Sequence, residues 1–140
     1  NELNKIGVNI KLITDGDVSG ALLVTEDKYN VDIFLGIGGG PEGVLSAAAL
    51  DTFKCFFQGR FLFNTEKDKL RANKMGINNL TKKYELNEIV KGDSIFCATG
   101  ITSGDLVSGL KIENNEIISE TLVTHKSSDM KKIIKKVVNS

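Results

Sequence analysis

Several segments of the chain alternate apolar and polar residues with the period of two that is typical of β-strands. Residues 8–13 alternate most clearly, and residues 31–35 form a short run rich in β-branched and aromatic side chains. The last third of the chain is also β-rich and contains a polar hairpin loop at residues 113–116. Strands are therefore predicted over residues 8–13, 31–35, 55–57, 93–98, 110–112, 117–124 and 130–138. The alternative for residues 130–138 is a basic amphipathic helix.

Helices are predicted between the strands in the first two thirds of the chain. Residues 41–50 carry apolar side chains on most sides, which indicates a buried helix, and Pro41 fits its first turn. Further helices are predicted over residues 2–6, 18–24 (with Asp17 as the N-cap), 66–75 and 86–90. Alternating strands and helices followed by a β-rich end favour a single α/β domain over residues 1–140. We expect three α/β/α layers with a mixed β-sheet.

A glycine-rich turn links the strand at 31–35 to the helix at 41–50. Its sequence is Gly36-Ile37-Gly38-Gly39-Gly40-Pro41-Glu42-Gly43. The helix N-terminus offers unpaired N–H groups and partial positive charge, and glycines let a ligand approach the backbone, so the turn predicts an anion site. Glu42 would repel a phosphate there unless a divalent cation lay between the two. The turn therefore indicates a metal-dependent phosphate-ester site.

Two alternatives compete for the same turn. Gly38, Gly40 and Gly43 match the spacing of a dinucleotide-binding fingerprint between a strand and a helix. Glu66 lies roughly where that fold has its ribose-binding acid. The fixed charge of Glu42 opposes this interpretation, because it would face the pyrophosphate without a metal. The second alternative is a tight turn that binds no ligand.

Asp15-Gly16-Asp17 forms another polar turn, directly after the strand at 8–13. Its carboxylates have three roles open to them: capping the turn and the next helix, binding a divalent metal, or accepting hydrogen bonds from a polyol substrate. Ligands of α/β sheets gather beyond the carboxyl ends of parallel strands. This turn and the glycine turn are therefore predicted to lie side by side if their strands are neighbours.

Three further features carry weaker signals. Residues 99–105 form a turn rich in hydroxyls and glycine, for which structural capping is the favoured role. His125 is the only histidine, and spacing indicates no Ser or Cys partner for it. The lysine pairs at 131–132 and 135–136 are most simply a solvated face.

Composition narrows the classes of partner. The chain has 18 Lys and Arg against 18 Asp and Glu, so no overall field favours nucleic acid or membrane. Cys55 and Cys97 lack metal-type spacing, and we expect reduced thiols in a cytoplasmic protein. No apolar run approaches the ~18 residues that a membrane span needs. The chain starts at Asn1 without a methionine, and it is expected to be a piece of a longer protein.

Taken together, these turns resemble those of one enzyme family. The segments that carry the resemblance are residues 12–22, 36–45, 58–60 and 98–106, which contain the Asp-Gly-Asp turn, the Gly-Pro-Glu-Gly turn, Gln-Gly-Arg and Ala-Thr-Gly-Ile-Thr-Ser-Gly-Asp-Leu. In order and spacing they resemble the C-terminal portion of the class II fructose-1,6-bisphosphatases, over essentially the whole chain. The family's Asp-Pro-x-Asp-Gly-Thr type motif and its basic phosphate-binding cluster are absent here.

The resemblance implies the C-terminal domain of a two-domain, lithium-sensitive sugar phosphatase that converts fructose 1,6-bisphosphate to fructose 6-phosphate in gluconeogenesis. It implies Mn²⁺ or Mg²⁺ as the cofactor, with Glu42 as a metal ligand and with substrate-binding residues Asp15, Gly16, Asp17 and Gly39. The implied partners are the sugar bisphosphate and the missing N-terminal domain, without which this chain is expected to be inactive. A homo-oligomer is compatible with the sequence, which does not separate fructose from sedoheptulose bisphosphate. The alternative is a non-catalytic nucleotide- or sugar-phosphate-binding domain that uses the glycine turn.

Overall fold

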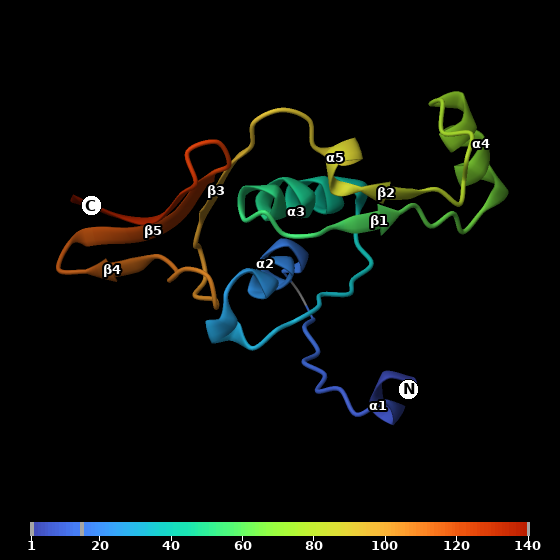
Figure 1. The fold of residues 1–140 in the computed structure, drawn as a ribbon. Helices are drawn as coiled ribbons and strands as arrows, with labels where there is room; N and C mark the ends of the chain where they lie inside the picture. Colours follow the sequence, from blue (N-terminus) through green and yellow to red (C-terminus); the bar gives the residue numbers. More distant parts are fainter. Residues whose placement is uncertain (1, 15, 140) are drawn as a thin grey trace.

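A computed structural model describes residues 2–14 and 16–139, and it contains both helices and strands (Figure 1), which confirms the α/β class. The helices are α1 (Glu2–Lys5), α2 (Asp17–Leu22), α3 (Gly40–Thr52), α4 (Glu66–Lys74) and α5 (Leu86–Ile89), with 3-10 turns η1 (Leu23–Thr25) and η2 (Asp27–Tyr29). The strands are β1 (Gln58–Arg60), β2 (Lys83–Glu85), β3 (Ile95–Thr99), β4 (Lys111–Glu113), β5 (Glu116–His125) and β6 (Met130–Asn139). None of the helices in the described part of the chain is long and apolar enough to cross a membrane.

Strand β5 is the centre of a four-stranded antiparallel sheet. β6 pairs with the whole length of β5, while β3 and β4 share its other side. The β4–β5 hairpin turns at Asn114 and Asn115, whose φ angles of 52° and 62° suit a tight hairpin turn that asparagine tolerates. The four strands predicted in the last third of the sequence are thus confirmed, with bounds that shift by at most two residues.

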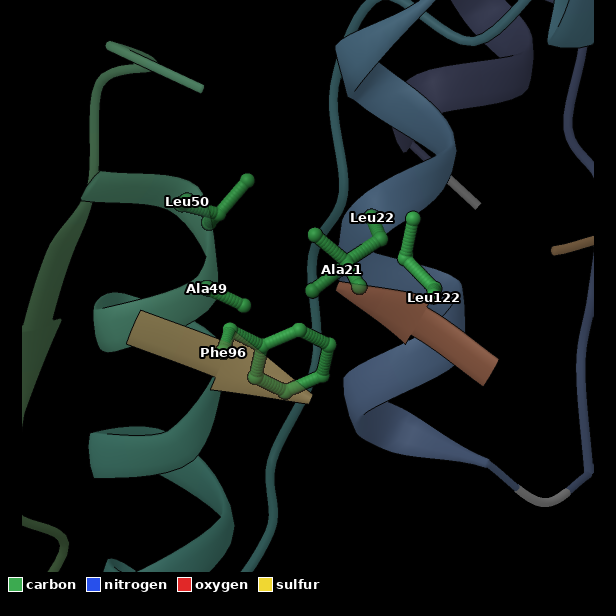
Figure 2. Close-up of a cluster of buried hydrophobic side chains, with 6 residues drawn as sticks. All are labelled: Ala21, Leu22, Ala49, Leu50, Phe96 and Leu122. Carbon is green, nitrogen blue, oxygen red and sulfur yellow. The ribbon is translucent and has the colours of Figure 1, made fainter. Parts of the chain in front are cut away.

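Helices α2 and α3 pack together against one face of this sheet and enclose the core (Figure 2). The six buried apolar residues of the core are Ala21 and Leu22 of α2, Ala49 and Leu50 of α3, Phe96 of β3 and Leu122 of β5. Phe96 lies opposite Thr124, and Ala98 lies opposite Leu122, so these four side chains share one face of the sheet. Alanines on both helices allow close approach, and the larger side chains fill the remaining space.

Buried polar groups fix α3 to the sheet. The hydroxyls of Thr52 and Thr124 form a buried hydrogen bond of 2.7 Å. Asp51, also buried, accepts hydrogen bonds from Ser94 Oγ (2.5 Å) and Lys126 Nζ (2.8 Å). Because each of these buried groups has a partner, the penalty for removing them from water is offset.

A smaller unit joins α3 to β3. β1 and β2 form a two-stranded antiparallel pair in which Gly59 lies opposite Tyr84. α4 begins with a capping box between Thr65 and Asp68, and Gly76 follows its end with a φ of 85°. The predicted helices at 66–75 and 86–90 are confirmed as α4 and α5. β1 begins three residues after the start predicted for this strand, because its register is set by β2, which was not predicted.

Two further predicted strands are wrong, besides the strand predicted at residues 55–57, which lies entirely before β1. Residues 8–13 and 31–35 are irregular segments that form no strand pairs in the described part of the chain (Figure 1). Their apolar pattern suits a strand, but no other strand in the described residues lies beside them. Every strand pair in residues 2–14 and 16–139 is antiparallel, so the parallel pairs that a mixed sheet also needs are not formed there. The helical layer on the main sheet is α2 and α3.

Candidate functional site

The two polar turns singled out in the sequence line one open cleft. The cleft has a volume of about 640 Å³, and it is lined by Thr14, Gly16, Asp17, Val18, Ser19, Gly39 and Glu42. The structure thus brings Gly16 and Asp17 together with Gly39 and Glu42. The sequence predicted this meeting for turns at the ends of neighbouring strands, but in the described residues no sheet joins the two turns. Asp15, the remaining predicted site residue, lies outside the described residues.

Three lining residues, Thr14, Val18 and Ser19, had no predicted role in the site, and two of them carry hydroxyl groups. Thr14 and Ser19 flank the Asp-Gly-Asp turn, one on each side, and both line the cleft. Their hydroxyl groups beside two acidic residues were the only sequence signal that could have indicated them. Ser19 also has a structural function, because its Oγ donates a hydrogen bond to the Gly16 carbonyl (2.8 Å).

The first wall of the cleft is the start of α2. Gly16 is the N-cap, with a φ of 80° that glycine adopts without strain. Its carbonyl accepts a hydrogen bond from the amide of Gly20 (2.8 Å). The prediction that Asp17 caps this helix is wrong: Asp17 is the first helical residue, and no side chain of the described residues caps the helix. The left-handed glycine takes the cap position and leaves Asp17 to line the cleft.

The second wall is the start of α3. Gly39 is the N-cap, with an extended backbone, and its carbonyl accepts a hydrogen bond from the amide of Gly43 (3.1 Å). Pro41 lies in the first turn, where a missing N–H has no helical partner to lose. A β-carbon on Gly39 would contact the carboxylate of Glu42. A side chain at this position would therefore displace the end of the Glu42 side chain from over the turn.

The two walls meet through Asp17. A β-carbon on Gly38 would lie 2.5 Å from Asp17 Oδ2, so the carboxylate rests directly against the glycine turn. Gly38 and Gly39 thus each make room for one carboxylate, whereas a β-carbon on Gly40 would meet open space. At two of the glycines in the turn a carboxylate thus lies where a side chain would begin, which the sequence pattern alone does not reveal.

The groups that line the cleft favour ligands of opposite charge. Asp17 is half-buried and Glu42 is exposed, and within the described part of the chain neither carboxylate has a hydrogen-bond or ion-pair partner. The unpaired N–H groups at the start of α3 favour an anion, whereas the two carboxylates favour a cation. An anion bound together with a divalent cation satisfies both requirements.

The carboxylates in the cleft are suitable ligands for a hard cation, but there are too few of them to hold it alone. Carboxylate oxygens are ligands that Mg²⁺ and similar ions prefer, usually with six or more oxygen or water ligands in total. Among residues 2–14 and 16–139, no group of three or more His, Cys, Asp and Glu side chains is arranged to hold a metal. The described residues therefore offer part of a cation site at most.

The turn at residues 99–105 belongs to a loop that is held in place by hydrogen bonds from its backbone amides. Gly100 N donates to Glu120 O (3.1 Å), and Gly109 N donates to Ser103 Oγ (3.0 Å). Ser108 N donates to Glu120 Oε2 (2.9 Å), which keeps the pKa of Glu120 below its usual value. These contacts agree with the structural role predicted for the turn, and none of its residues lines the cleft.

His125 has partners that its spacing did not indicate. Its Nε2 lies 2.7 Å from Asp93 Oδ2 and 3.0 Å from Ser127 Oγ, while its Nδ1 lies 2.9 Å from Ser128 Oγ. Asp93 also accepts a hydrogen bond from Ser127 N (3.0 Å). Hydrogen bonds from Ser127 and His125 hold the pKa of Asp93 below its usual value. The cluster ties the β5–β6 turn to the residues before β3 and does not line the cleft.

The chain matches the family model described as bacterial fructose-1,6-bisphosphatase, glpX-encoded, over residues 1–138. It is 35% identical to the D-fructose 1,6-bisphosphatase class 2/sedoheptulose 1,7-bisphosphatase of Synechococcus sp. (strain JA-3-3Ab), over 91% of this chain and 40% of that protein. The proteins of the same description from Trichormus variabilis and from Synechocystis sp. (strain ATCC 27184 / PCC 6803 / Kazusa) are each 32% identical, over 95% of this chain and 42% of theirs. The chain thus spans about two fifths of the length of these curated relatives.

Proposed function

Because the chain belongs to the family of bacterial, glpX-encoded fructose-1,6-bisphosphatases, we propose that it forms the C-terminal domain of a metal-dependent sugar phosphatase. The full-length enzyme hydrolyses the 1-phosphate of fructose 1,6-bisphosphate to give fructose 6-phosphate in gluconeogenesis, in the cytoplasm. The observation that carries this proposal is the meeting of Asp17 and Glu42 in one cleft at the start of α3.

The wall at α3 is the phosphate side of the proposed site. Glu42 provides one carboxylate ligand for Mn²⁺ or Mg²⁺, and the amides at the start of α3 offer hydrogen bonds to phosphate oxygens. A divalent cation at such a site polarises a phosphoryl oxygen and lowers the pKa of a water molecule that can attack phosphorus. Gly39 keeps the backbone open to the substrate, because any β-carbon there would meet Glu42.

The wall at α2 is the sugar side. Asp17, half-buried and without a partner in the described residues, accepts hydrogen bonds from substrate hydroxyls, together with Gly16 and Asp15 of the same turn. A buried acceptor discriminates against sugars that leave it unpaired. The names of the relatives include both fructose 1,6- and sedoheptulose 1,7-bisphosphate, so both sugars are candidate substrates.

Dinucleotide binding at the same glycine turn is less well supported. In that arrangement a pyrophosphate approaches the backbone of the fingerprint glycines. Here the carboxylate of Asp17 rests against Gly38, and that of Glu42 lies over Gly39. Two negative charges at the glycines oppose a pyrophosphate that carries no metal.

The proposal requires further ligands from outside the 140 residues. The chain spans about 40% of its relatives, and the described residues hold no cluster of three metal-ligating side chains. The missing N-terminal domain of the same enzyme is the proposed source of the other metal ligands and of the basic groups for the second phosphate. A homo-oligomer of the full-length enzyme is compatible with this arrangement.

The direct test compares phosphate release by the 140-residue chain and by the full-length protein that carries it. We expect the full-length protein to hydrolyse fructose 1,6-bisphosphate with Mn²⁺ or Mg²⁺, and the chain alone to stay at the level of a heat-killed control. Release by the chain alone would show that it holds a complete site. A full-length protein without phosphatase activity that binds NAD saturably at micromolar concentration would support the dinucleotide alternative instead.

A further inference from the structure

Seven large apolar side chains are exposed on the two segments that were predicted as strands and on the residues that directly follow, and four of these are more than 70% exposed. The four are Leu12 (88% exposed), Ile33 (72%), Leu35 (74%) and Ile37 (83%). They lie on residues 8–13 and 31–37, which we call the open strands. So much apolar surface on neighbouring segments is characteristic of a covered surface rather than of one that faces water.

Each of the open strands places one side chain against α2 and leaves most of its other side chains exposed. Phe34 packs against the core, and a β-carbon on Gly20 of α2 would lie 2.9 Å from its Cε2 atom. Ile13 reaches the same point, because the same β-carbon would contact its Cδ1 atom. Ile33 and Leu35, the neighbours of Phe34, are largely exposed instead. This alternation is that of a β-strand with α2 on its inner side.

The backbone of the open strands is unpaired as well. No amide or carbonyl of residues 8–13 or 31–37 forms a backbone hydrogen bond within the described part of the chain. β5, by contrast, is paired on both of its edges. Unpaired backbone beside exposed, alternating apolar side chains offers hydrogen bonds to an added strand and pockets for its side chains.

We propose that the open strands pair with a strand from the part of the full-length enzyme that this chain does not span, and that the same part covers their outer side. The inference rests on the proposed function for the identity of that part. The relatives are about two and a half times as long as the region they share with this chain, so they contain the polypeptide required.

The position of the open strands supports the same occupant. One of them leads into the cleft at Thr14, and the other leads into it at Gly39. A strand added beside them therefore ends next to Asp17 and Glu42, where the proposed cation lacks ligands. One interface would both complete the sheet and deliver the missing side chains to the cleft.

Amide hydrogen exchange, followed by mass spectrometry, tests the pairing. In the 140-residue chain we expect amides of residues 8–13 and 31–37 to exchange at nearly unprotected rates. In the full-length protein they should exchange at least about a hundredfold more slowly. Amides of β3 and β5, already paired, serve as the internal reference for folding in both proteins. Equal exchange of the open strands in the two proteins would overturn the inference.

Substitutions on the exposed side of the open strands test the proposed cover. In the full-length protein, Ile33→Asp and Leu35→Asp should remove the protection of the open strands while the β3 and β5 amides stay protected. The matched control is Leu70→Asp on α4, an exposed leucine (61%) away from the cleft. In the chain alone, all three substitutions should leave the melting temperature nearly unchanged. Protection that survives both Ile33→Asp and Leu35→Asp contradicts the proposed cover.

A hybrid protein provides a second test of the inference. Here the chain replaces the matching segment of the Synechococcus sp. (strain JA-3-3Ab) relative. Protection of the open strands in a protein without phosphatase activity keeps this inference and contradicts the proposed function. Phosphatase activity without protection of the open strands supports the proposed function and contradicts this inference. The absence of protection in the natural full-length protein overturns the inference whatever the hybrid shows.

Discussion

Glu42 combines two electrostatic roles at one position. It lies in the first turn of α3, where a negative charge stabilises the helix dipole, and it lines the cleft beside Asp17. The first role concerns the stability of the fold, and the second concerns the proposed cation. Glu66 occupies the first turn of α4 and pairs with Lys69 (2.6 Å), but it does not line the cleft, so it shares the first role and lacks the second.

This difference separates the two roles in the full-length enzyme. Glu42→Gln should lower phosphatase activity by orders of magnitude, because a hard cation loses a charged oxygen ligand, and excess Mn²⁺ should restore part of it. Glu66→Gln should leave activity within about twofold. Each change should cost roughly 0.3–1 kcal/mol in the free energy of unfolding. Steady-state rates over a series of Mn²⁺ concentrations provide the measurement, and a near-normal rate for Glu42→Gln at low Mn²⁺ would contradict the role as a ligand.

Asp93 gives the fold a dependence on pH. Hydrogen bonds from Ser127 and His125 lower its pKa in the folded state. A lowered pKa contributes stability that is present above the unfolded value of about 3.9 and is lost as the pH falls through the folded value.

We therefore expect wild type to melt at a higher temperature than Asp93→Asn at pH 6, and the difference to shrink below about pH 4. The control is Asp32→Asn, whose carboxylate has no hydrogen-bond partner in the described part of the chain. Its difference from wild type should change little over the same range. Thermal melts followed by circular dichroism from pH 2.5 to 7 provide the test, and a constant difference for Asp93→Asn would contradict it.

At the scale of residues, the sequence identified the cleft through the chemistry of its side chains. Glu42 and Asp17 were indicated by acidic groups beside glycine turns, and both line the cleft. The contact between Asp17 and Gly38 could not be predicted, because it depends on how the two turns approach in space. The partners of His125 could not be predicted for the same reason, because Asp93 is distant in the sequence.

At the scale of elements, α2 and α3 depend on close packing by small residues around a few larger ones. Leu22 of α2 is fully buried in the cluster with Leu50, Phe96 and Leu122 (Figure 2). Leu22→Ala should lower the free energy of unfolding by about 2–5 kcal/mol, because truncation leaves a cavity between the helices and the sheet.

Leu70→Ala on the exposed side of α4 is the matched control, and it should cost less than about 0.5 kcal/mol. Urea unfolding of the 140-residue chain measures both changes. Equal midpoints for the two variants would show that α2 is not part of the cooperative core.

Elements whose partners lie nearby in the sequence were predicted best. The β4–β5 and β5–β6 hairpins follow from apolar runs on either side of short polar loops. α3 follows from the proline in its first turn, and α4 follows from a charged, sparsely apolar run that ends near Gly76. β1 was misplaced because its register depends on β2, and residues 8–13 and 31–35 were called strands on a pattern whose pairing the described residues do not supply.

At the scale of the whole molecule, the described residues hold one side of a site and one side of a surface. The cleft presents two carboxylates and the start of α3, and the open strands present apolar side chains beside unpaired backbone. Both features adjoin at Thr14 and Gly39. The completeness of the site and the burial of the open strands are therefore expected to change together in the full-length enzyme.

The position of β6 at the rim of the main sheet bears on how copies of the chain meet in solution. β6 is ten residues long and pairs only with β5 in the described residues, so its other edge has free backbone groups for a neighbouring chain. Four exposed lysines, Lys131, Lys132, Lys135 and Lys136, are spread along it and alternate between its two faces. Two such edges brought together would set lysine against lysine, and this repulsion protects the protein from edge-to-edge aggregation.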